Sequence, residues 1–232
     1  MIHDDINPKI TNFNKQVDAE DRLFLTLRYL ISGMSFSQLS YSRISKSCVA
    51  YIVKSVCRAI WNASKDIYMP KPTRKDWERI SQEFLLHSGF TNCFGALGGK
   101  HIYIKCPPNS GSQFYCYKHR FTVVLLALTD IYRKLLYIDV GAYGKQSDGG
   151  VFKKISLYRE IINNTLDLPP DKAFPGQNEN MPYVMVADDA FPLSSYLMKP
   201  YPKNGLSLEE REYNMRLSHA CVSVNINFLW YF

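Results

Sequence analysis

Apolar residues recur at helical spacing in the first part of the chain and change to a strand-like pattern further on. A first helix is predicted to be capped by Asp18 or Asp21 and to end at Gly33, a residue type that favours helix ends. Its predicted apolar face consists of Leu23, Leu27, Leu30 and Ile31. A short second helix is expected over residues 36–39.

Two longer helices follow. One begins after Ser45, and its apolar positions are Val49, Ile52, Val53, Val56 and Ile60. Pro70 and Pro72 interrupt the pattern because proline cannot donate the helical backbone hydrogen bond. Thr73 then begins a fourth helix, whose apolar positions are Trp77, Ile80 and Phe84. The first three helices are typical of a helix-turn-helix, although a small helical bundle with a solvated basic face explains the pattern equally well.

Strand-like runs appear after Gly89. They cover residues 101–105, 121–129 and 135–140, with turn-forming sequences at 107–111 and 130–134 between them. A fourth strand is expected at residues 183–187, after a loop rich in Pro, Gly and Asn at 169–182.

Helical spacing returns in two places in this second region. One helix is predicted after Asp148, with apolar positions at Val151, Phe152, Ile155, Tyr158 and Ile162, and the last begins near Leu208. The order predicts an α/β class, a ribonuclease-H-like mixed sheet flanked by helices and preceded by a small all-helical, helix-turn-helix-like domain. The expected divisions are a tail at 1–17, the helical region at 18–90 and the nuclease-like domain at 91–232.

The composition of the chain indicates which kinds of binding partner are compatible with it. The net charge is +7 and the pI near 9.0, which is compatible with a polyanion such as DNA. No apolar run is long enough to cross a bilayer, and the acidic start of the chain is unlike a secretory signal. The cysteines are expected to be reduced, with a zinc site at His101, Cys106, Cys116 and His119 as the less favoured alternative.

Acidic residues stand in one of the places where a two-metal nuclease needs them. Asp188 and Asp189 follow the fourth predicted strand, where they could bind a cation or, alternatively, cap a following helix. The first strand region, residues 95–105, contains no acid, and the terminal helix contains none after Glu212.

Several longer segments resemble one family. They are RISKSCVAYIVKSVCRAIW, FTNCFGALGGKHIYIKCPPNSGSQFYCYK, VVLLALTD, YIDVGAYGKQSDGGVF, VADDAFPLSSYLMKPYP and YNMRLSHA, which occur in this order. Together they are similar to the PIF/Harbinger group of DDE transposases and their nuclease-like domesticated relatives. The resemblance implies DNA cleavage that depends on a divalent cation, Mg²⁺ or Mn²⁺.

The resemblance also implies where the catalytic acids belong. The first Asp of the family stands in a GAxDGxH motif, where this chain has Gly98, and the final Glu stands where it has Asn225. Of the three acids, Asp188 alone is retained. We therefore expect weakened metal binding at Asp188, with Asp148 and Asp189 as further candidates, and little or no cleavage. Asp148 has a more favoured alternative role as the N-cap of the helix that follows it.

The end of the chain departs from the family as well. The family helix continues, whereas this sequence stops at an aromatic run, residues 228–232. A decayed transposon copy, or a gene model that lacks its true end, explains this departure together with the lost acids.

Cations near the first strands are candidate phosphate contacts. They are Lys100, His101, Lys105, Lys118, His119 and Arg120, to which the third helix adds Lys46, Lys54 and Arg58, with Arg43 just before it. Each alone is more often a solvated surface charge. The resemblance implies DNA as partner, a second Myb-like DNA-binding protein, and a nuclear location with the cytoplasm as an alternative.

Three interpretations follow from these residues. The chain is a metal-dependent nuclease, a catalytically silent DNA-binding or scaffold protein, or a non-functional transposon remnant. The replaced acids favour an inactive copy over an active one.

Overall fold

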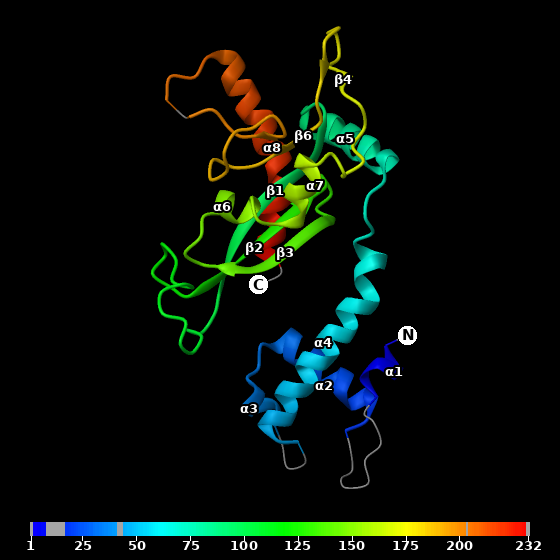
Figure 1. Ribbon diagram of the computed structural model, residues 1–232, viewed down its shortest axis with the longest axis vertical. Helices are drawn as coiled ribbons and strands as arrows, with labels where there is room; N and C mark the ends of the chain where they lie inside the picture. The colour runs from blue at the N-terminus through cyan, green and yellow to red at the C-terminus, as the bar shows by residue number, and fades with distance from the viewer. Residues whose placement is uncertain (1, 8–16, 41–43, 203, 231–232) are drawn as a thin grey trace. The chain divides into compact units, whose positions relative to one another are not determined.

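The computed structural model describes residues 2–7, 17–40, 44–202 and 204–230, the last eight of these by their backbone alone. The chain divides into two units, Met1–Pro70 and Lys71–Phe232 (Figure 1). Each unit has its own hydrophobic core.

The first unit consists of helices α1 (His3–Ile6), α2 (Ala19–Ser32), α3 (Phe36–Leu39) and α4 (Lys46–Tyr68). The predicted caps are confirmed. Asp18 accepts a hydrogen bond from the Asp21 amide, Ser45 accepts one from the Cys48 amide, and Gly33 ends α2 in the left-handed conformation. Helix α1 lies in the segment expected to be a tail, and Ile6 is buried in the core of this unit.

The predicted apolar face of α2 is wrong. Leu25 is buried against the other helices, whereas Leu30 and Ile31 are 56% and 85% exposed. Apolar residues surround most of this helix, so their spacing does not single out one face. On α4 the predicted face is confirmed: Val49, Ile52, Val53 and Val56 are all buried.

The second unit is built on a five-stranded mixed sheet in the order β3-β2-β1-β6-β7. The strands are β1 (Cys93–Tyr103), β2 (Thr122–Thr129), β3 (Leu135–Tyr143), β6 (Val184–Val186) and β7 (Leu197–Met198). The two-residue strands β4 (Lys172–Ala173) and β5 (Asn180–Met181) pair separately, inside the segment expected to be a loop.

Strand β1 is longer than predicted, since it begins at Cys93 rather than at residue 101. The added segment contains Gly95, Gly98 and Gly99, which weaken a strand signal in the sequence. Hydrogen bonding to β2 on one side and β6 on the other nevertheless holds this segment extended.

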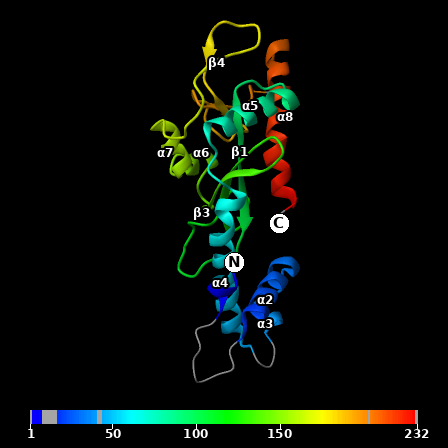
Figure 2. The same cartoon turned by 90° about the vertical axis from the view of Figure 1, so that its right-hand side faces the viewer.

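Helices cover both faces of the sheet. In Figure 2, α8 (Leu208–Trp230) runs along one side, and α6 (Asp148–Phe152) and α7 (Ser156–Ile162) lie on the other. The sequence predicted one helix where α6 and α7 stand; the chain breaks at residues 153–155, and Ile162 is 51% exposed.

Helix α5 (Arg74–Ser88) belongs to the sheet unit, whereas the sequence pattern grouped it with the helical region. Its Trp77 is buried edge-on against Phe94 of β1, and the indole Nε1–H donates to the Leu166 carbonyl at 3.1 Å. The buried residues of α5 complete the core under β1, so the unit boundary lies near Pro70.

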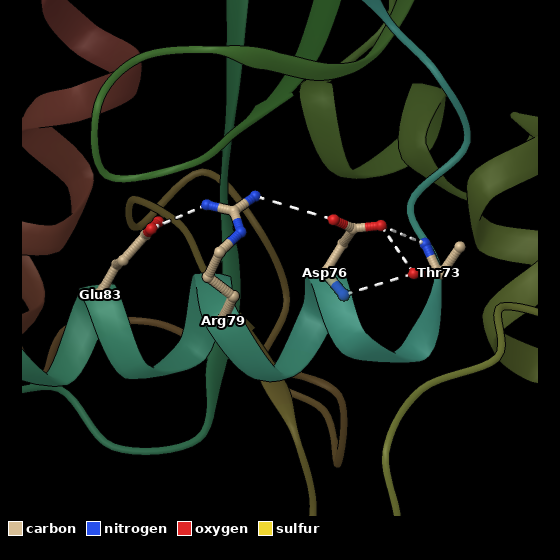
Figure 3. A network of polar contacts seen from close by, with 4 residues as sticks. All are labelled: Thr73, Asp76, Arg79 and Glu83. Carbon is tan, nitrogen blue, oxygen red and sulfur yellow. Dashed lines mark hydrogen bonds and ion pairs between the residues drawn. The ribbon is translucent and has the colours of Figure 1, made fainter.

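A polar network fixes the start of α5 (Figure 3). Thr73 and Asp76 form a reciprocal capping box, and these hydrogen bonds lower the pKa of the Asp76 carboxyl. Arg79 lies between Asp76, at 3.9 Å, and Glu83, at 2.7 Å. The predicted helix start at Thr73 is thereby confirmed.

The order of three antiparallel strands, short helices, a parallel strand and a terminal helix is that of a ribonuclease-H-like fold, as predicted. Among the described residues, no helix combines the length and apolar character needed to span a membrane.

Candidate functional site

The site expected from the sequence lies where β1 and β6 run side by side. Ala96 and Val186 are partners in this parallel pair. Continuing the same register by two residues sets Gly98 level with Asp188. Gly98 is buried, so an acidic side chain at this place on β1 would lie within the fold, beside the end of β6.

Asp188 lies in a turn and caps no helix. Its Oδ1 accepts a hydrogen bond from the Ala190 amide at 3.1 Å, and the backbone then turns toward Phe191. The helix-cap alternative is therefore wrong. The Asp188 side chain reaches solvent, yet partial desolvation, together with the neighbouring Asp189 carboxylate, raises the pKa of the Asp188 carboxyl.

Asp148 points inward at the start of α6. Ser147, not Asp148, is the N-cap residue, because its hydroxyl accepts from the Gly150 amide at 3.3 Å. The favoured capping interpretation of Asp148 is therefore wrong. Its Oδ1 is buried and has no hydrogen-bond partner among the described residues. A buried carboxylate oxygen without a partner is costly, and such an arrangement is typical of functional sites.

Gly99 makes room for this carboxylate. A Cβ atom on Gly99 would lie 2.5 Å from Cγ of Asp148, closer than two carbon atoms can approach. Successive residues of a strand face opposite sides, so Gly98 and Gly99 have different surroundings. Gly99 is therefore needed for the Asp148 carboxylate to fit. The two residues are far apart in the sequence, and no spacing pattern predicts their contact.

Electrostatic shifts connect the two retained carboxylates. Burial raises the pKa of Asp148; His101 offsets part of this rise, and the negative charge of Asp188 adds to it more weakly. Burial lowers the pKa of His101, which Asp148 partly offsets. Burial, with a contribution from Asp188, raises the pKa of the Cys221 thiol on α8 to about 12. Asp148 and His101 therefore influence each other's pKa, and Asp188 adds a smaller effect on Asp148.

The donor set fits one hard cation incompletely. Magnesium is commonly held by one or two carboxylates plus water and substrate phosphate oxygens, and the unpaired oxygen of Asp148 provides one such donor. The described residues contain no group of three or more His, Cys, Asp or Glu side chains that could enclose a metal, which gives the zinc alternative no support. Asn225 lies in α8, but its side chain is outside the described residues.

Most of the predicted phosphate contacts gather around the connection between β1 and β2. His101 shares a hydrogen bond with the Thr122 hydroxyl at 2.9 Å, and Lys100 is half-buried. The remaining members are exposed: Lys105, Lys118, His119 and Arg120. The structure therefore gathers these cations around one connection of the sheet, and His101 and Lys118 are close enough to Asp148 to lower the pKa of its carboxyl.

The cations of the first unit form a separate group. Lys46, Lys54 and Arg58 are all exposed on α4. A cavity of about 680 Å³ lies beside Lys54 and Arg58. Arg43 is outside the described residues.

Comparison with known proteins identifies the family. The model of the DDE superfamily endonuclease family matches residues 97–228, which is more than half of the chain. The chain belongs to this family. The matched segment of this DDE endonuclease domain contains Gly98, Asp148, Asp188 and Asn225, and the family resemblance carried by the motifs is confirmed.

One curated relative extends the comparison beyond this domain. The chain is 26% identical over 232 residues to "Protein ALP1-like" from Arabidopsis thaliana, covering 95% of this chain and 55% of the relative. The chain thus spans about half the length of that protein. No solved structure matches the present chain.

Proposed function

We propose that this chain is a transposase-derived DNA-binding protein that keeps the DDE endonuclease fold and has lost DNA cleavage. The observation that carries this proposal is Gly98: the place on β1 level with Asp188 bears no side chain. In the two-metal reaction, the cations activate the attacking oxygen and stabilise the leaving one, and carboxylates must hold both cations about 3.5–4 Å apart.

The remaining donors support at most one weakly held cation. Asp188 and Asp148 are the proposed ligands, with Asp189 as an outer candidate. The amide of Asn225, if it faces the site, is a weaker ligand for Mg²⁺ or Mn²⁺ than the glutamate of the family. With one cation the attacking and leaving oxygens are not both stabilised, so hydrolysis falls to background.

DNA binding depends on different residues and is proposed to persist. Lys105, Lys118 and Arg120 neutralise backbone phosphates, and each contact contributes through counterion release without needing a complete set. A nuclear location and a Myb-like partner belong to the same proposal, because a DNA substrate and the family resemblance support them. The activity of any longer protein that contains this domain is likewise a proposal.

One observation favours a second candidate, residual nicking by an altered site. The unpaired Oδ1 of Asp148 is a second donor, and the charge of Asp188 contributes to the raised pKa of Asp148, so these two carboxylates together are the ones that could hold a cation. In that case the unaltered chain nicks DNA in Mn²⁺, and Asp148→Ala abolishes the activity.

A plasmid-nicking assay tests both candidates. The proteins compared are the unaltered chain, the double variant Gly98→Asp/Asn225→Glu, and the control Gly98→Asn/Asn225→Gln. The control adds side chains of the same size at the same two places but no carboxylate. We expect nicking in Mg²⁺ or Mn²⁺ from the double variant alone. Nicking by the unaltered chain would contradict the loss of cleavage.

A further inference from the structure

The connection between β1 and β2 combines exposed aromatic rings with cations. Tyr103, Tyr115 and Tyr117 are 56%, 41% and 75% exposed. Lys105, Lys118, His119 and Arg120 are exposed in the same segment. The sequence has no acidic residue between Glu83 and Asp130, so no carboxylate within this long stretch offsets its positive charge. We call residues 103–121 the tyrosine hairpin.

Backbone hydrogen bonds hold the outer part of the tyrosine hairpin in a defined turn. The Cys116 amide donates to the Arg120 carbonyl at 2.9 Å, and the His119 amide donates to the Cys116 carbonyl at 3.0 Å. His119 adopts a positive φ of 57°, which closes the turn. Tyr115 and Phe121 pair across the base. The exposed rings are therefore attached to an ordered backbone.

Side-chain contacts orient the rings themselves. Tyr117 packs edge-to-face with His101, with ring centroids 5.5 Å apart, and Lys118 Nζ lies 5.4 Å from the Tyr117 centroid. The Arg120 guanidinium lies over the Tyr103 ring at 5.0 Å. Rings held this way lose little freedom when a flat ligand stacks on them.

The tyrosine hairpin contacts β1 close to Asp148. Tyr117 packs on the ring of His101, and Gly99, two residues earlier on the same face of β1, lies against the Asp148 carboxylate.

We propose that the tyrosine hairpin binds an unpaired DNA strand, with bases stacked on Tyr117 and Tyr103 and phosphates paired with Lys118 and Arg120. This inference rests on the proposed DNA binding and names the form of DNA. In a duplex, neighbouring base pairs cover the base faces, so cations alone would suffice there. Exposed rings between cations are the arrangement that single strands need, because every base has a face that can stack.

Fluorescence anisotropy with the full chain tests the proposal. The probes are a 20-residue oligodeoxythymidine, an abasic strand of the same length, and a 20-base-pair duplex. We expect the unaltered protein to prefer the oligodeoxythymidine to the abasic strand. Tyr117→Ala should weaken oligodeoxythymidine binding by at least about 5-fold, the lower limit for one stacked base, and should change duplex binding less than about 2-fold.

Two matched variants separate stacking from folding. Tyr117→Phe keeps the ring and should retain binding. Tyr132→Ala removes a comparably exposed tyrosine, 60% exposed, in the turn between β2 and β3, and should leave single-strand binding unchanged. Thermal unfolding of each variant verifies that the fold is intact.

The outcomes separate this inference from the proposed function. If the protein binds no DNA of any form, the proposed function fails and the inference fails with it. If the duplex binds but Tyr117→Ala leaves oligodeoxythymidine binding unchanged, the inference alone is overturned. The inference would also be overturned if Tyr117→Ala weakened binding of the single strand, the abasic strand and the duplex equally. Tighter binding of an RNA strand of the same length than of the oligodeoxythymidine would overturn it too.

Discussion

The two carboxylates, Asp148 and Asp188, and the tyrosine hairpin differ in completeness. The set of metal ligands has lost a member, whereas the set of candidate DNA contacts has not. Asp148 and Asp188 are the two candidate donors, and Gly98, the place on β1 level with Asp188, has no side chain. The hairpin retains exposed cations and oriented rings. Metal-assisted cleavage requires every ligand at once, whereas phosphate contacts contribute separately. We therefore expect substitutions that abolish cutting to leave DNA binding largely intact.

The largest expected effect is on the fold around the carboxylates. Gly99→Ala places a Cβ 2.5 Å from Cγ of Asp148, so the carboxylate or the strand must move. We expect a loss of about 1–3 kcal/mol in the free energy of unfolding, the usual cost of overpacking. Urea unfolding measures it. If the clash is the cause, Gly99→Ala/Asp148→Ala regains most of the loss, and a double variant no more stable than the single would break this link.

A somewhat smaller effect should separate the two regions in DNA affinity. Lys118→Ala/Arg120→Ala removes two proposed phosphate contacts, so we expect duplex binding to weaken by roughly 10-fold and its dependence on salt to become shallower by about two in the log–log slope. Asp188→Ala removes a negative charge and should leave affinity equal or tighter. Weaker binding by Asp188→Ala than by the lysine–arginine variant would contradict the division of roles.

A smaller effect concerns the free energy of unfolding, which the charged form of Asp148 is expected to lower. The pKa of Asp148 is raised in the fold above its ordinary value of 3.8, so the folded state holds this proton more tightly. By linkage, the contribution to stability is complete below 3.8 and is lost as pH rises through the folded pKa.

Asp148→Asn removes this loss. At pH 7, without divalent cations, we expect it to stabilise the fold by about 1 kcal/mol, the scale of relieving a buried group without a partner. The gain should vanish toward pH 3.5 or lower, near the unfolded pKa of about 3.9. Thermal unfolding across this range measures it. A variant less stable than the unaltered chain at pH 7 would mean that Asp148 has a structural partner.

The sequence predicted the fold well where local chemistry decides it. Asp18, Ser45 and Thr73 each cap a helix through their own side chains, so helix starts were readable from single residues. The start of β1 was not readable, because pairing with two neighbouring strands overrides the low strand propensity of its glycines. The face of α2 was wrong because its apolar residues are spread around the helix.

The candidate site was predictable only in part. Asp188 could be located, because an apolar strand ends directly before it. The role of Asp148 could not: whether Ser147 or Asp148 caps α6 is a difference of one residue, and the contact with Gly99 joins segments far apart in the chain. The family resemblance located Gly98 and Asn225, which no physical pattern in the sequence distinguishes.

The most direct test of the central claim is plasmid nicking in Mn²⁺ by three proteins. They are the unaltered chain, Gly98→Asp/Asn225→Glu, and the same double variant carrying Asp188→Ala. We predict nicking by the double variant alone, because by the family resemblance Asp188 is the one catalytic acid that the chain retains, and the other two must be restored around it. Nicking by the unaltered chain, or equal nicking with and without Asp188, would contradict it.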